Sequence, residues 1–211
     1  GAVSLAGVSP AFRELFGITS EEQAKNLGIV QMNQVFEDKN GSGATVTVKE
    51  AAADQEQFYI LVEFAAPEGT VLPEPDQVEE GFNRAVLWGG PDGRGIGFGA
   101  YRDESCTSFI GSSEAGYAID YVEDSDPTDN KMEFIIRGHI DPMPKDAAYC
   151  LFSGIQSLCM QYQGEWVTML DGMDIDLIVP LVGMGTHYDF QGRCGVNLNG
   201  VTLAVAENLT I

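Results

Sequence analysis

The sequence predicts a mainly β protein, an antiparallel β-sandwich of immunoglobulin-like character with one or two short N-terminal helices. Helix signals are confined to the first 28 residues. Beyond them, short runs rich in β-branched and aromatic residues recur, several with alternating polarity. Turn-forming residues separate these runs at the spacing of about 8–12 residues that is typical of sandwiches. We therefore expect a helical segment over 1–28 and a β-sandwich domain over 29–211.

Both predicted helices begin at a serine. Ser9 stands at an N-cap position, with Pro10 at the first helical position. Ser20 stands at a second N-cap, with Gln23 in the capping-box position. Gly28 is expected to follow the end of the second helix.

Two hairpins are predicted from strand alternation and turn residues. Ala44–Glu50 and Gln57–Phe64 form the first. Val196–Leu198 and Val201–Leu203 form the second, because the intervening Asn199-Gly200 is a type I′ turn signature. The other predicted strands are Arg84–Trp88, Gly95–Tyr101, Thr107–Ile110, Tyr117–Val122, Met132–Ile140, Tyr149–Tyr162, Trp166–Leu170 and Ile175–Leu181.

The four cysteines are Cys106, Cys150, Cys159 and Cys194. An even number permits two disulfides, in any of three connectivities. A two-residue turn opened by Gly154 would place Cys150 opposite Cys159 at a non-hydrogen-bonded pair, within disulfide reach. The alternative is one long strand, in which these two cysteines lie about 30 Å apart and cannot bond. No Cys-x-x-Cys occurs and there are two histidines, so a structural zinc site is not expected.

The charge balance restricts the classes of partner. The chain has 32 acidic and 11 basic residues, a net charge of −21. Such a surface repels nucleic-acid phosphates and anionic lipid head groups, so neither is an expected partner. Cationic partners and divalent ions are favoured by comparison. No window approaches the roughly 20 apolar residues that a transmembrane helix needs.

Two loops contain residues that could hold an ion. The glycine-rich run Gly89–Gly99 resembles a phosphate loop, but no helix start follows it, so we predict a turn that enters a bulged strand. Asp124–Asn130 gathers oxygen ligands as a calcium loop would. It lacks the glycine and the bidentate glutamate of an EF-hand, having Asp129 and Ile135 at those positions. A solvated turn is favoured over a weak Ca²⁺ site.

Few residues suggest catalysis. Asp174 and Asp176 share one face of a predicted strand and could serve a cation or acid–base hydrolysis, but the outer face of a half-exposed strand is the favoured explanation. His139 and His187 each precede an aspartate by two positions, yet no Gly-x-Ser-x-Gly elbow accompanies them. We predict no catalytic, cofactor-binding or metal-binding residue, and no enzyme.

The large aromatic residues are expected in the core or at its rim, or else on an exposed platform for sugars or peptides. The two tryptophans are Trp88 and Trp166.

Several short elements occur in a recognisable order: Val8–Phe12, Leu27–Ile29, Gln31–Gln34, Val46–Val48, Ala53-Asp54 and Tyr59-Ile60. In this order the chain resembles the extracytoplasmic domain of unknown function found in membrane-anchored, anti-sigma-factor-like proteins of Firmicutes. The resemblance covers residues 8–65 well, and the rest mainly through Gly164-x-Trp166 and the last hairpin. It rests on packing residues, so no functional residues carry over.

The resemblance implies a location and a role. In such proteins a short cytoplasmic segment and one transmembrane helix precede the domain, and the apolar stretch Ala2–Val8 fits the exit from that helix. We expect a sensing or binding ectodomain anchored to the cell membrane of a bacterium, with a protein, peptide or glycan ligand outside the cell. The alternative is a passive surface spacer or adhesion module, with or without Ca²⁺ stabilisation.

Overall fold

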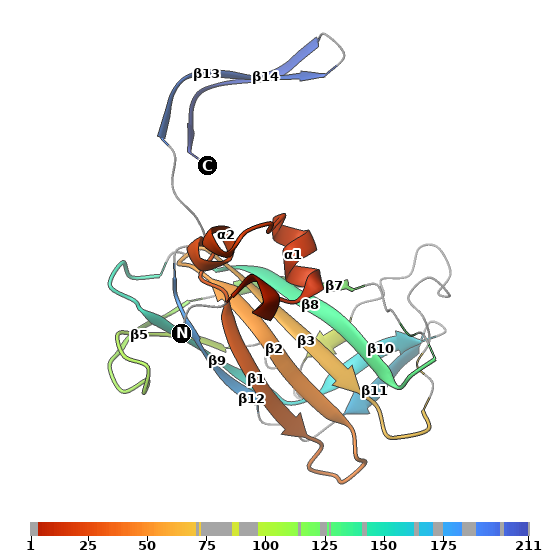
Figure 1. Ribbon diagram of the computed structural model, residues 1–211. Coiled ribbons are helices and arrows are strands. Elements are labelled where there is room, and N and C mark those ends of the chain that lie inside the picture. The colour runs from red at the N-terminus through yellow and green to blue at the C-terminus, as the bar shows by residue number, and fades with distance from the viewer. Residues whose placement is uncertain are drawn as a thin grey trace.

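The computed structural model describes residues 4–70, 72, 86–88, 97–113, 115–122, 126, 128–140, 143–162, 165–170, 175–182, 189–198 and 201–210. Most of these residues lie in antiparallel strands, and two short helices stand at the N-terminus (Figure 1). The predicted β-sandwich with short N-terminal helices is confirmed.

A five-stranded sheet has the order β1–β2–β3–β8–β7, with every neighbouring pair antiparallel. The predicted hairpin of 44–50 with 57–64 is its β2–β3 pair. Strands β3 and β8 lie far apart in sequence, yet they pair along the whole length of β3. The bounds are β1 (Val30–Glu37), β2 (Thr45–Ala53), β3 (Gln57–Ala65), β8 (Lys131–Ile140) and β7 (Ala115–Tyr121).

A four-stranded sheet, β12–β9–β5–β6, forms the second layer, and a three-stranded sheet, β11–β10–β4, continues from it along the chain. In the four-stranded sheet, β5 occupies the end of the glycine-rich run and has a bulge against β6, as predicted. The bounds are β12 (Ile175–Pro180), β9 (Tyr149–Ile155), β5 (Gly97–Tyr101), β6 (Phe109–Ser113), β11 (Glu165–Leu170), β10 (Leu158–Tyr162) and β4 (Val86–Trp88).

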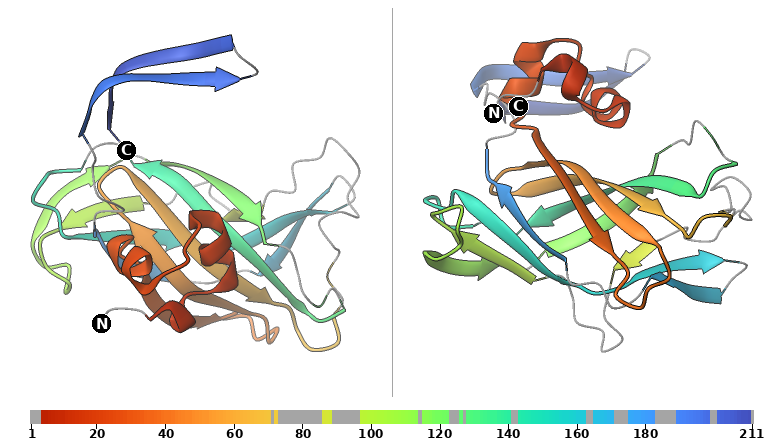
Figure 2. Two further views of the ribbon diagram at one scale, coloured as in Figure 1. Left: turned by 45° about the horizontal axis from the view of Figure 1, so that its top comes forward. Right: turned by 60° about the horizontal axis from the view of Figure 1, so that its bottom comes forward.

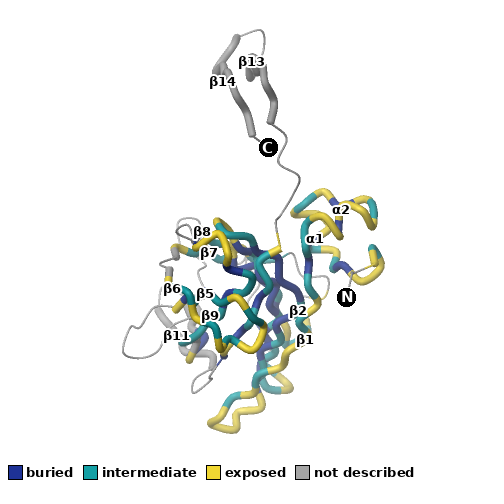
Figure 3. The backbone as a smooth tube through the Cα atoms, turned by 90° about the vertical axis from the view of Figure 1, so that its left-hand side faces the viewer, coloured by how far each residue is buried: buried dark blue, intermediate teal, exposed yellow. Residues whose placement is uncertain are grey.

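The main core lies between the two layers. Phe58 of β3 meets Phe98 of β5 and Phe152 of β9, with ring centroids 5.4 and 5.0 Å away, and those two rings are 4.5 Å apart. All three side chains are almost fully buried. The burial-coloured tube accordingly shows its dark blue segments inside the sandwich (Figure 3). Because aromatic side chains bury large apolar areas, this cluster fixes the packing of one sheet on the other.

The helices cover the outer face of the five-stranded sheet (Figure 2). A short 3-10 turn, η1 (Leu5–Gly7), leads into α1 (Pro10–Phe16) and α2 (Glu21–Asn26). Both predicted caps are confirmed: the Ser9 side chain accepts from the Phe12 N–H, and Ser20 with Gln23 forms the full capping box. A second apolar cluster seals the helices to the sheet; its buried members are Val8, Phe12, Ile18, Ala24, Ile29, Ala52, Leu61 and Ile135.

The predicted strand Tyr149–Tyr162 is corrected to two strands in different sheets. Strand β9 pairs with β12 and β5, whereas β10 pairs with β11 and β4. Gly154, with a φ of +86°, supplies the backbone conformation near this change of sheet. The two strands are not paired with each other, so the hairpin that would align Cys150 with Cys159 is wrong. A single continuous strand is wrong as well.

The predicted C-terminal hairpin is confirmed as β13 (Asp189–Leu198) and β14 (Val201–Thr210), with Leu198 opposite Val201. Its turn residues, Asn199 and Gly200, lie outside the described residues. Figure 1 shows the hairpin standing away from the sandwich, and over the described ranges it pairs with no other strand.

Candidate functional site

The outer face of the five-stranded sheet has three zones. One lies under the helices. The second is a group of ion pairs in which Lys49 contacts Glu63 and Glu133, and Lys131 contacts Glu63 at 3.4 Å. The third, beyond the helices at the start of β3, is an open depression of about 500 Å³ across β3, β8 and β7. It is the candidate functional site.

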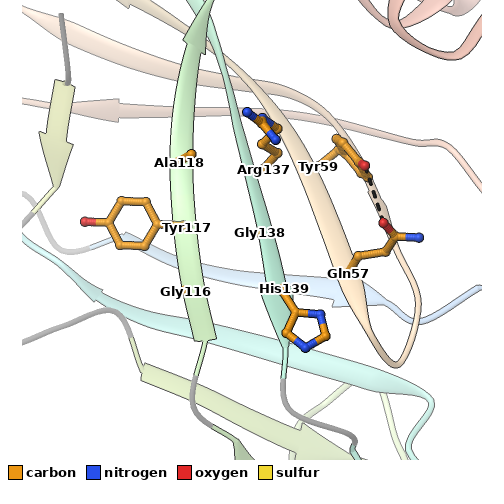
Figure 4. A pocket seen from close by; sticks show the side chains of 8 residues that line it. All are labelled: Gln57, Tyr59, Gly116, Tyr117, Ala118, Arg137, Gly138 and His139. Atoms are coloured by element: carbon orange, nitrogen blue, oxygen red, sulfur yellow. Dashed lines mark hydrogen bonds between the residues drawn. The ribbon is translucent and has the colours of Figure 1, made fainter. Parts of the chain in front are cut away.

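Side chains that alternate outward on three paired strands line most of the depression, and two inward-facing positions between them, Tyr117 and Gly138, complete the lining (Figure 4). Gln57 lies opposite His139, and Tyr59 lies opposite Arg137. Because side chains of a strand point to opposite faces in turn, these four share the outer face, while the intervening Phe58 enters the core. The complete lining is Gln57, Tyr59, Gly116, Tyr117, Ala118, Arg137, Gly138 and His139.

Small residues create the hollow. On β7, Gly116 lies opposite His139 and Ala118 lies opposite Arg137. A Cβ atom added at Gly116 would meet no other atom within 4 Å, so the missing side chain leaves open space there. Gly138 has the reverse role, because its missing side chain leaves room in the core for the ring of Phe58.

The polar groups of the depression are held by local contacts. The Tyr59 hydroxyl donates to Oε1 of Gln57 at 3.4 Å. Arg137 forms an ion pair with Asp120, whose hydrogen bond raises the pKa of the guanidinium above its already high value. Both side chains are about half exposed, so the pair remains accessible to a ligand.

A chain of aromatic rings links the depression to the first helix. Tyr59 packs edge-to-face against Phe16 with ring centroids 5.0 Å apart, and Phe16 packs likewise against Phe12 at 5.3 Å. Phe12 is fully buried under α1. A ligand that moves the Tyr59 ring must therefore change the packing of α1.

A buried carboxylate fixes the other end of α1. Glu50 is 2% exposed and accepts hydrogen bonds from the Ser9 N–H and hydroxyl, both at 2.8 Å, and from the Gln31 amide at 2.7 Å. A β-bulge at Lys49 turns both Lys49 and Glu50 to the outer face, since Val48 before them and Ala51 after them enter the core. Glu50 thus joins the N-cap of α1 to the sheet.

The carboxylates of the acidic turns accept hydrogen bonds from residues of the same turns. Asp103 accepts from Ser105, Thr107 and Ser108, and these hydrogen bonds, first that of Ser105, hold the pKa of its carboxyl well below the usual range. Asp126 accepts from Thr128 in the same manner, with a lowered pKa. These carboxylates build their own turns.

The structure brings one of the sequence candidates to the depression. His139 is exposed at its rim, at the end of β8. Asp176 is exposed on β12, away from that face. The remaining candidates lie outside what the structure describes, either wholly or in their side chains; they are Trp88, Gly89–Ile96, Asp124, Ser125, Pro127, Asp141, Trp166, Asp171–Asp174, His187 and Asp189. Among the described residues, no group of three or more His, Cys, Asp or Glu side chains could hold a metal ion.

Sequence reasoning missed the rest of the depression, because Gln57, Tyr59 and Arg137 read as ordinary outward positions of strands. The available signal was their alternation with apolar core residues on two strands. It could not show that β3 and β8 are neighbours.

Of the four cysteines, Cys106 and Cys150 are free. Cys150 is fully buried, and desolvation, with a further contribution from Cys106, raises the pKa of its thiol to about 12. The proposed Cys150–Cys159 disulfide is therefore not formed in this fold. The side chains of Cys159 and Cys194 lie outside the described part.

Cys150 is expected to resist alkylation in the native protein. At pH 8 a thiol with a pKa near 12 is ionised to about one part in ten thousand, and the thiolate is the reactive form. Iodoacetamide should label Cys150 only after unfolding in urea, as measured by mass spectrometry of its peptide. Rapid native labelling, or a Cys150 disulfide in a non-reducing peptide map, would contradict the expectation.

Comparison with protein-family models, curated proteins and solved structures gives no match for this chain. The resemblance to the extracytoplasmic domain family thus stays a prediction. Within the described ranges, no helix has the length and apolarity that a membrane crossing requires.

Proposed function

We propose that this chain is the extracytoplasmic sensing or binding domain of a membrane-anchored, anti-sigma-factor-like regulatory protein. In this proposal the ligand binds outside the cell, in the depression across β3, β8 and β7. The order of packing residues over 8–65 supports the regulatory class. The observation that carries the proposal is the contact between Tyr59 in the depression and Phe16 on α1.

The contact offers a physical route from ligand to anchor. A regulator of this kind must pass the bound state of its outer domain to the segment that enters the membrane. Here α1 lies between the depression and the N-terminal stretch, held by Phe16 at one end and by Glu50 at the other. A ligand that favours one position of Tyr59 shifts the equilibrium of α1, because coupling requires different contacts in the two states.

The polar groups of the depression favour binding over catalysis. Gln57, Tyr59 and Arg137 supply hydrogen-bond donors and acceptors. The Tyr59 hydroxyl is already bonded to Gln57, and Arg137 is already paired with Asp120. This arrangement recognises a ligand without an activated nucleophile. We therefore propose no reaction at this site.

The first test is genetic context. The reading frame upstream of residue 2 is expected to encode a short cytoplasmic segment and one apolar helix, beside a sigma-factor gene. A cleavable signal peptide with no such neighbour would overturn the regulatory proposal. The passive spacer or adhesion module would then be favoured, and a melting temperature raised by millimolar Ca²⁺ would identify its Ca²⁺-stabilised form.

The second test is functional and uses the full-length protein in its native cell. Gly116→Leu, which fills the depression, and Phe16→Ala, which cuts its link to α1, are both expected to change output from a sigma-dependent reporter. Lys131→Ala, on the same sheet face but outside the depression, should leave it unchanged. Protein abundance is followed by immunoblotting. Unchanged output for Gly116→Leu at normal abundance would overturn the proposal.

A further inference from the structure

We infer that the depression across β3, β8 and β7 binds a neutral saccharide. This inference rests on the proposed function, since it names the ligand class of the same site. It is carried by three features of the depression: its charge, its hydrogen-bonding groups and its shape.

The charge of the depression favours an uncharged ligand. The Arg137 guanidinium is neutralised by Asp120, which leaves His139 as the other titratable basic group of the lining. An anionic ligand meets no unpaired guanidinium here and is repelled by the net charge of −21. A cationic ligand finds no carboxylate in the described lining, and the nearby Asp120 already serves Arg137. A neutral ligand is not repelled by the net negative charge and needs no carboxylate partner.

The hydrogen-bonding groups suit hydroxyls. The bond from Tyr59 to Oε1 of Gln57 leaves the two N–H groups of that amide and the lone pairs of the phenol. Arg137 bonds Asp120 through Nε, which leaves further guanidinium donors, and the imidazole of His139 adds both kinds of site. Donors and acceptors are thus interleaved on one surface. A saccharide hydroxyl is itself both a donor and an acceptor, so each can bond to two such groups.

The shape suits a ring lying on a sheet face. Three neighbouring strands, about 4.8 Å apart, form the floor, and Gly116 and Ala118 keep part of it nearly bare. The Tyr59 ring adds an apolar wall whose position Phe16 fixes. A peptide added to the edge strand β7 would instead bond through its main chain at the edge. It would make little use of side chains on β3 and β8.

The test titrates the isolated chain with a panel of soluble neutral oligosaccharides: N-acetylglucosamine, glucose, mannose, galactose and xylose oligomers. Sulfated and carboxylated saccharides and extended peptides provide the comparison. Binding is read from saturable chemical-shift changes of backbone amides in two-dimensional NMR. We expect at least one neutral oligosaccharide to shift amides of 57–59, 116–118 and 137–139.

Variants then locate the site. Gly116→Leu is expected to weaken saccharide binding at least about tenfold, and Tyr59→Phe to weaken it while keeping the ring. Lys131→Ala should bind like the unaltered chain, and circular dichroism checks the fold of each. The inference is overturned if no neutral saccharide shifts these amides, if only charged saccharides or peptides do, or if Gly116→Leu binds normally.

The two proposals fail differently. A reporter that responds to Gly116→Leu, together with no saccharide binding, would overturn the ligand class and support the sensing role. Saccharide binding that Gly116→Leu abolishes, with an unchanged reporter, would support the ligand class and overturn the regulatory role.

Discussion

Replacing Gly138 by alanine is expected to lower the free energy of unfolding by about 3 kcal/mol, at the upper end of the usual cost of overpacking a core. The new Cβ atom would lie 2.2 Å from Cζ of Phe58 and 2.6 Å from the backbone oxygen of Gly116. The ring of Phe58 cannot move aside easily, because Phe98 and Phe152 pack against it from the opposite sheet. The added methyl group must therefore displace backbone or disrupt the aromatic cluster.

Gly116→Ala is the matched control for this experiment. Gly116 lies opposite His139, the residue after Gly138, across the β7–β8 pair, but its added Cβ would meet nothing within 4 Å. Its effect is expected to stay within about 0.5 kcal/mol, as for most surface substitutions. Urea unfolding followed by fluorescence measures both. A double variant with Phe58→Leu should recover part of the loss at Gly138, and equal stability of the two alanine variants would contradict the packing argument.

Local chemistry made the helices and hairpins predictable. Ser9 with Pro10, and Ser20 with Gln23, mark helix starts through hydrogen bonds that form within a few residues of each other. The β2–β3 hairpin is likewise defined by alternation on either side of a short turn, where Asp54 accepts from the Glu56 and Gln57 N–H groups. Such features depend little on the rest of the chain.

Irregular strands escaped prediction for physical reasons. Strand β1 was not delimited, because a bulge between Gln31 and Gln34, with Asn33 at a φ of +48°, breaks the alternation of its outward and inward residues. The change of sheet between β9 and β10 is not predicted because strand-forming residues resume at Leu158 after only Gln156 and Ser157, and the sequence does not show which partner each strand will find.

The depression could not be predicted because it depends on the pairing of strands that lie far apart in the sequence. Its lining comes from three strands, and β3 meets β8 only because a long stretch of chain returns to the sheet. No spacing in the sequence brings Tyr59 near Arg137. The sequence singles out His139 only through its His-x-Asp context, and the structure places its side chain at the rim of a polar hollow.

Replacing Glu50 by alanine is expected to cost about 3 kcal/mol, because it removes a buried carboxylate that accepts hydrogen bonds from both polar groups of Ser9 and from Gln31. The carboxylate accepts three hydrogen bonds, two from Ser9 and one from Gln31, at 2.7–2.8 Å. Glu50→Gln keeps an amide oxygen for the Ser9 and Gln31 N–H groups, and its NH₂ can donate to the Ser9 hydroxyl. Its cost should be nearer 1 kcal/mol.

The place where Glu50→Ala loses hydrogen-exchange protection distinguishes a specific hold on α1 from a general loss of stability. Since Glu50 joins Ser9 at the N-cap of α1 to the sheet, Glu50→Ala should reduce hydrogen-exchange protection in α1 and β1 far more than in β8. Lys49→Ala is the neighbouring control; its ion pairs are partly exposed, so a loss below about 1 kcal/mol is expected. Equal costs for the two variants, or a uniform loss of protection, would show that Glu50 does not hold the helix. The sensing proposal requires such a hold, because α1 can relay the state of the depression only while both of its ends are attached.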